Sequence, residues 1–249
     1  RAPLRLAGGD LNAITAIGGI IVGVAIGILF LRSGFSLGRS TKLHAAAGWI
    51  MPAVMIGVLL LAIFVPSFIY KSESGPGSLH ASLWISIVVG LVVGVLAQRT
   101  RMCFAGGWRD LIMVRDTYLF SGIAAFFIAA LVTNYALGCV HWGFIRAGTP
   151  DAATYIAQDN HLWNFFSMVL VGLSATLLGG CPLRQTILSG EGDTDAGVTV
   201  LGMLVGAAFA HNFVLASSVK GIGANSEVAV IIGLLFCIII GFFMREKAA

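Results

Sequence analysis

The amino-acid sequence predicts an all-α polytopic membrane protein with about seven transmembrane helices, short re-entrant half-helices and pseudo-repeated halves. The first observation is composition: 58% of the residues are hydrophobic and only 10% are charged, whereas a soluble domain carries about a quarter charged residues. The second is that the apolar residues gather in runs close to the ~20 residues that a helix needs to cross a bilayer. The third is that two runs end in polar stretches rich in Cys, Gly and Arg. Interrupted segments of this kind are typical of transporter binding sites.

The apolar runs define the elements of a single integral membrane domain over residues 1–249. The first run carries Gly19, Gly23 and Gly27 at every fourth position, and the third carries Gly90 and Gly94. Such ridges of small residues let helices approach closely in lipid, so we interpret both as packing surfaces. In order, the runs lie near residues 14–31, 46–70, 81–98, 118–139, 162–179, 196–215 and 227–244.

The runs also fall into two similar halves. Runs one and five both end in a stretch with Gly and Arg and lead through a short polar segment to a Gly-rich helix. Runs three and seven both end in basic residues. We therefore predict an internal repeat of approximately residues 14–110 and 162–247, with the fourth run between the copies.

The loop charges favour an N-terminus outside and a C-terminus in the cytoplasm. If each run crosses once, ten of the 15 Lys and Arg residues lie on the cytoplasmic side. The margin falls to six against five without the four motif arginines, Arg39, Arg101, Arg109 and Arg184. An outer N-terminus without a signal peptide further predicts native sequence upstream of Arg1. The ten cytoplasmic residues are Arg32, Arg39, Lys42, Arg99, Arg101, Arg109, Arg115, Arg184, Arg245 and Lys247.

Residues 179–185 form the first candidate site. Two glycines allow a sharp turn and proline is favoured in the first turn of a helix, so Cys181 is expected at the N-cap of a helix that begins at Pro182. Backbone N–H groups at a helix start attract anions and activate thiols, and Arg184 falls in the first turn. We predict a site for a sulfur- or selenium-containing anion, with Gly180, Cys181 and Arg184 as binding residues. The alternative is a small cysteine buried in a packed turn.

Residues 99–110 form a related stretch directly after the third run. By the same reasoning Cys103 is predicted to contact the substrate. Arg101 either steers the substrate or anchors the chain at the cytoplasmic face. Arg109 is expected to pair with another group, because an unpaired charge inside a membrane is costly. The candidate binding residues of this stretch are Arg101, Cys103, Gly106, Gly107 and Arg109.

The remaining polar residues give weaker indications. His211 lies inside the sixth run and is either a substrate-binding residue or a hydrogen-bonding residue between helices. Cys139 and His141 are too few to predict a metal site, and no cofactor is expected. Asp193 or Asp195 is expected to cap the helix of the sixth run, the alternative being a site for a coupling cation.

The two cysteine motifs resemble those of a known family. Residues 101–110 (RMCFAGGWRD) and 180–185 (GCPLRQ) are similar to the YeeE/YedE sulfur-transport family, and most similar to its YedE branch, described as selenium transporters. The resemblance covers most of the chain. It implies an inner-membrane importer in which short helices enter from both sides toward a central constriction. In thiosulfate-transporting relatives, pore cysteines pass the anion along by sulfur-centred hydrogen bonds, a role that falls here on Cys103 and Cys181. Those relatives use a third pore cysteine. In this chain neither position 35, which is Phe35, nor Cys237 obviously supplies it, so a selenium species stays possible as the substrate.

We therefore expect an inner-membrane importer of a small selenium- or sulfur-containing compound, without chemical turnover. Thiosulfate uptake is the alternative within transport. A membrane sulfurtransferase that forms a persulfide or selenosulfide on Cys181 is the alternative from another class. The expected partners are the substrate anion and the lipid bilayer, and a cytoplasmic sulfur or selenium carrier protein is left open. Nucleic acid is not expected, because no clustered basic face is visible outside the membrane-flanking loops.

Overall fold

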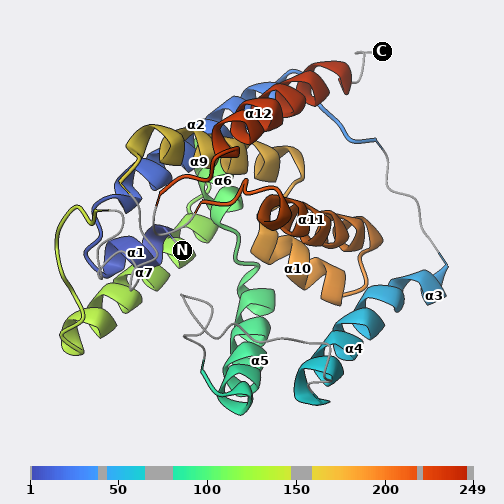
Figure 1. Cartoon of the computed structure of the whole chain (residues 1–249). Coiled ribbons are helices and arrows are strands. Elements are labelled where there is room, and N and C mark those ends of the chain that lie inside the picture. The colour runs from blue at the N-terminus through green and yellow to red at the C-terminus, as the bar shows by residue number, and fades with distance from the viewer. Residues whose placement is uncertain (1, 39–43, 65–80, 147–158, 218–220, 246–249) are drawn as a thin grey trace. The chain divides into compact units, whose positions relative to one another are not determined.

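The computed structural model describes residues 2–38, 44–64, 81–146, 159–217 and 221–245. Within these ranges the regular structure is helical (Figure 1), apart from two isolated β-bridges, Asp10 with Gly143 and Phe35 with Arg245. The described helices are α1 (Ala2–Ala7), α2 (Ala13–Arg32), α3 (Ala45–Gly48), α4 (Ile50–Phe64), α5 (Leu83–Thr100), α6 (Phe104–Met113), α7 (Tyr118–Ala136), α9 (His161–Leu177), α10 (Pro182–Gly190), α11 (Thr194–Asn212) and α12 (Ser226–Phe243).

Seven segments of the described chain are long and apolar enough to cross a membrane, which confirms the prediction of an all-α, multi-pass membrane protein. The described helix ends lie within about four residues of the predicted runs, apart from the end of the second run, which lies outside the described residues. The agreement arises because the apolar stretch fixes the length of a lipid-spanning helix. The short helices α6 and α10 follow α5 and α9 directly in sequence. The segments are Ala13–Arg32, Ala45–Phe64, Leu83–Met113, Tyr118–Ala136, His161–Gly190, Thr194–Asn212 and Ser226–Phe243.

Some predictions fall on residues that the structure does not describe. The end of the second run after Phe64 is one of them, and so is part of the charge count behind the predicted orientation. The basic residues outside the described ranges are Arg1, Arg39, Lys42, Lys71, Lys220 and Lys247. The orientation and the internal repeat stay predictions.

The chain divides into two compact units. The first comprises Arg1–Gly38, Cys103–Cys181 and Ala207–Ala249, and the second comprises Arg39–Met102 and Pro182–Gly206. Each unit is therefore assembled from segments far apart in the sequence. Two of the four boundaries fall at the cysteine motifs, and both Cys103 and Cys181 belong to the first unit.

The first unit is built on α2 and α9, which lie side by side (Figure 1). Gly23 of α2 is so close to α9 that an added Cβ would collide with the backbone carbonyl of Val169. At Gly27 an added Cβ would lie 2.6 Å from Cβ of Thr176, and at Gly172 of α9 it would strike the carbonyl of Ile20. Glycine is required where two backbones approach this closely, so the predicted packing ridge of the first run is confirmed.

The N-terminal segment of the first unit is fixed by buried polar contacts. Asp10 is fully buried, and its carboxylate accepts from Nε of Arg5 at 2.7 Å and from the backbone N–H of Asn12 at 3.0 Å. The side-chain amide of Asn12 donates to the carbonyl of Ile145 at 2.7 Å. These bonds compensate for removing the charges from water, and they join the start of α2 to the segment that follows α7. The sequence analysis did not predict α1 or this network.

The second unit contains α3, α4, α5, α10 and the first part of α11. Gly197 of α11 leaves room for Met51 of α4, whose Cγ would be 2.7 Å from an added Cβ. Asp193 accepts from the backbone N–H of Ala196 at 3.0 Å, which confirms its predicted role as a helix cap. Within the described residues, nothing lies within 4 Å of an added Cβ at Gly90 or Gly94 of α5.

Candidate functional site

Cys103 is the N-cap of α6. Its backbone is extended (φ −148°, ψ 115°), and its Sγ accepts the backbone N–H of Gly106 at 3.2 Å. Ser, Thr, Asp and Asn usually fill this position, because their side-chain oxygen satisfies an N–H that the helix leaves unpaired. Here sulfur does so, and the thiol is therefore held at the positive end of the α6 dipole.

Cys181 meets Cys103 across 78 residues of sequence. Its backbone N–H donates to Sγ of Cys103 at 3.2 Å, so that one sulfur accepts two backbone N–H groups. Both side chains are buried, with 5% of Cys103 and 6% of Cys181 exposed, and neither forms a disulfide. The helix that follows Cys181 begins at Pro182, as predicted. The resemblance to YeeE/YedE proteins implies that both cysteines are pore residues, but the bond between them was not predicted.

The two thiols lie in apolar surroundings within the first unit. Val24 and Ile28 of α2, Ala175 of α9 and Ala105 of α6 form a buried cluster with the cysteines, and Ile20 and Trp108 pack against it. We call these residues and the two cysteines the thiol cluster. Thiol sulfur is polarizable and compatible with such packing, and the thiol cluster itself contains no charged side chain.

Two of the three predicted glycines, Gly106 and Gly107, have a steric reason in the structure. An added Cβ at Gly106 would be 3.1 Å from Cβ and 3.2 Å from Sγ of Cys103. At Gly107 it would be 2.5 Å from Cδ1 of Ile123 on α7. Gly180 is buried, and Gly179 has a φ of 76°, a left-handed conformation that favours glycine. Their direct contact with substrate stays a prediction.

The predicted basic residues are distributed over both units. Arg109, on α6, pairs with its neighbour: Nε donates to Oδ1 of Asp110 at 2.8 Å. Arg101 and Arg184 belong to the second unit. Arg101 ends α5 in a left-handed conformation, with φ 52°. His211, near the end of α11, is exposed and is not part of the thiol cluster.

Arg184 has an unusual environment in the described chain. Its Nη1 is buried and has no hydrogen-bond partner there. An unpaired buried N–H of a guanidinium is costly, and an anion would remove the cost. On the same helix, α10, the polar side chains of Gln185 and Ser189 are also buried. The sequence analysis missed these two residues, although their spacing of four places them on one helix face.

Residues 99–245, more than half of the chain, match the family described as "Sulphur transport". This chain belongs to the sulphur-transport family. The match confirms the resemblance to YeeE/YedE proteins, and the matched residues include both cysteine motifs.

One relative of this sulphur-transport protein is the thiosulfate transporter TsuA of Spirochaeta thermophila, which is 30% identical over 125 residues. The aligned segment covers 50% of this chain and 35% of the relative, so the chain spans about a third of the relative's length. No solved structure matches the chain.

Proposed function

We propose that this protein transports a small sulfur-containing anion across the inner membrane toward the cytoplasm, with thiosulfate as the first substrate to consider. Membership of the sulphur-transport family and the similarity to a thiosulfate transporter support this proposal. The seven apolar segments supply the framework that a transporter needs. Selenium compounds of similar size and charge are the other substrates that the sequence motifs indicate.

The observation that carries the proposal is the sulfur of Cys103. A cysteine sulfur is a weak acceptor, and its S–H is a weak donor. Here the acceptor capacity is used by the N–H groups of Gly106 and Cys181. The side chain of Cys103 is also hydrogen-bonded to the side chain of Cys181. An incoming anion would replace that contact and accept from the S–H, which the two N–H bonds polarise. A weak, neutral donor suits transport, because a conducted ion must be bound firmly enough to enter and loosely enough to leave.

The surroundings of the thiols favour transport over catalysis. A sulfurtransferase would need groups that activate the thiol and bind a sulfur acceptor. In the described chain the side chains of the thiol cluster other than the two cysteines are apolar or, for Trp108, aromatic. Of the arginines, Arg109 of α6 is paired with Asp110, which weakens its attraction for an anion. Arg184 belongs to the second unit and has a buried, unpaired Nη1, so we infer that it binds an anion on α10.

The decisive experiment is uptake of labelled thiosulfate, selenite and selenide by cells that express the protein or its Cys103→Ser and Cys181→Ser variants. Serine keeps a capping oxygen but removes the sulfur. We expect uptake of one substrate to fall about tenfold or more in both variants, equivalent to about 1.4 kcal/mol of barrier.

Cys237 supplies the matched control, because it is half-buried in the apolar helix α12 away from both motifs. Cys237→Ser should transport normally at equal expression. Unchanged uptake in the Cys103 and Cys181 variants would refute the assignment of the thiols. A persulfide or selenosulfide on Cys181 during turnover, detected by mass spectrometry of the intact protein, would instead support the sulfurtransferase.

A further inference from the structure

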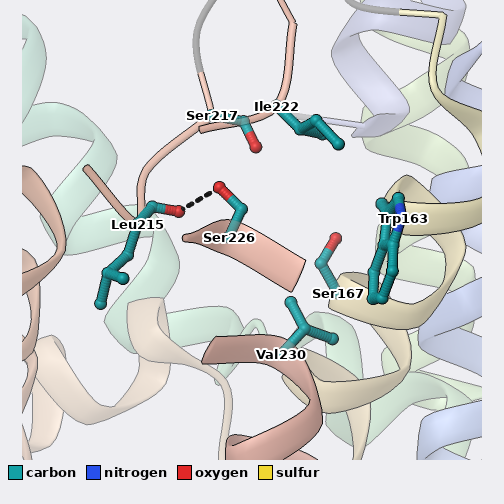
Figure 2. Close-up of a pocket in the computed structure, with 7 residues that line it drawn as sticks. All are labelled: Trp163, Ser167, Leu215, Ser217, Ile222, Ser226 and Val230. Carbon is teal, nitrogen blue, oxygen red and sulfur yellow. Dashed lines mark hydrogen bonds between the residues drawn. The ribbon is translucent and has the colours of Figure 1, made fainter. Parts of the chain in front are cut away.

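The first unit contains a cavity of about 230 Å³ at the start of α9. Its walls come from the first two turns of α9 and of α12 and from the segment after α11 (Figure 2). We call it the serine cavity, after Ser167, Ser217 and Ser226, which line it together with Trp163 and Leu215. The volume is several times the ~30 Å³ that one water occupies in the liquid, so it admits a small polyatomic ion.

The hydroxyl groups give the serine cavity its chemistry. Figure 2 shows the hydroxyl oxygens of Ser167 and Ser217 facing the space between them. Ser226 is buried, and its hydroxyl donates to the carbonyl of Leu215 at 2.6 Å, which ties the start of α12 to the segment after α11. The indole of Trp163 forms one wall. A serine hydroxyl has one proton, and Ser167 and Ser226 both donate theirs to backbone carbonyls. An oxyanion would therefore accept from the hydroxyl of Ser217, and from that of Ser167 once it rotates away from its backbone carbonyl; the indole of Trp163 carries one further N–H donor.

The helix dipoles at the serine cavity favour an anion, and one neighbouring carboxylate opposes it. None of the described residues that line it is acidic or basic. Trp163 and Ser226 lie in the first turns of α9 and α12, where the helix dipole presents partial positive charge. Glu227, the next residue on α12, is half-buried and is not a lining residue. Its charge weakens anion binding, and weak binding lets a transported ion move on.

The serine cavity and the thiol cluster lie at opposite ends of one helix. Trp163 is in the first turn of α9, and Ala175, which belongs to the thiol cluster, is in its last. The two sites are thus separated by ~18 Å along α9, at 1.5 Å per residue. A helix of 17 residues connects them within one unit.

We propose that the serine cavity is a second binding site for the transported sulfur oxyanion, which occupies it before reaching the thiols. This inference rests on the proposed transport of such an anion. In the predicted orientation the start of α9 is on the outer side, so the serine cavity collects substrate from outside the cell. The ligand is held by uncharged donors there and by sulfur at the thiol cluster.

The first test compares two serines of α9 that make the same local hydrogen bond. Ser167 donates to the carbonyl of Asn164 at 3.1 Å, and Ser174 donates to that of Val171 at 3.2 Å, but only Ser167 lines the cavity. In thiosulfate uptake, Ser167→Ala and Ser217→Ala should raise KM about threefold to tenfold, the effect of one hydrogen bond, with the maximal rate unchanged. Ser174→Ala should match the wild type. Equal KM values in all four proteins would overturn the proposal.

The second test measures binding without transport. The purified full-length protein carrying Cys103→Ser and Cys181→Ser is titrated with sodium thiosulfate, and its tryptophan fluorescence is recorded. We expect a saturable change that disappears when Trp163→Phe is added and that sodium gluconate does not produce. The same change with gluconate would show a response to sodium or ionic strength and would overturn the anion site, as would no change at all.

The two tests separate the failure of this inference from that of the proposed function. If wild-type protein takes up none of the labelled compounds while the saturable fluorescence change is seen, the serine cavity binds the anion and transport is refuted. If uptake depends on the cysteines while serine substitutions and fluorescence show no effect, transport holds and the second site is refuted.

Discussion

The helices α2 and α5 carry similar ridges of glycine and are packed differently. Gly19, Gly23 and Gly27 of α2 all face close neighbours on α9, whereas an added Cβ at Gly90 or Gly94 of α5 meets nothing within 4 Å among the described residues. The apolar part of α2 is 39% buried, whereas that of the span that contains α5 is 6% buried. The spacing of the glycines therefore shows where a second helix can approach closely. Whether one does so depends on the neighbouring helix.

Gly23→Leu is expected to have the largest effect on stability. A side chain there would collide with the backbone carbonyl of Val169, which cannot rotate away. Overpacking of this kind costs about 3 kcal/mol or more, so we expect little folded protein in the membrane. Fluorescence-detected size exclusion and thermal unfolding in detergent measure it. A variant as stable as the wild type would show that α2 and α9 are farther apart than described.

Gly27→Ala is expected to have an intermediate effect, because its added Cβ would meet the side chain of Thr176 at 2.6 Å. The side chain of Thr176 can shift, whereas a backbone cannot. We therefore expect the free energy of unfolding to fall by about 1–3 kcal/mol. Thr176→Gly removes the obstructing atoms, and in the double variant the loss should be partly recovered. Thermal unfolding of both single variants and the double variant gives the coupling energy. Strictly additive losses would contradict the contact.

Gly94→Leu is expected to have the smallest effect and is the matched control for Gly23→Leu. Nothing in the described chain obstructs the new side chain. The free energy of unfolding should therefore change by no more than about 0.5 kcal/mol. The same unfolding measurement applies. A loss of stability as large as that of Gly23→Leu would show that another segment or molecule covers this face of α5 in the membrane.

The sequence predicts the helices well, because a lipid-spanning helix must be apolar over a fixed length. It also predicts the start of α10 at Pro182, because two glycines, a cysteine and a proline combine local preferences that act within a few residues. Asp193 was predicted as a cap for the same reason. Each of these features depends on neighbours in sequence.

The features that the sequence does not reveal depend on distant segments. The bond from Cys181 to the sulfur of Cys103 joins residues 78 positions apart, and no periodicity encodes it. The buried pair of Arg5 and Asp10 was missed because α1 is too short and too polar to stand out as an apolar run. The serine cavity was missed because it depends on where the chain after α11 meets α9.

The sulfur of Cys103 starts a helix and also links two remote segments. Any reagent that alkylates or oxidises this atom adds a group to a buried sulfur that two N–H groups contact, and so disturbs both hydrogen bonds at once. Inhibition by a thiol-directed compound would therefore combine obstruction of the substrate with local unfolding, and labelling at this position cannot tell the two apart. Replacement by serine separates them, because an oxygen preserves the start of α6 while the chalcogen chemistry is lost.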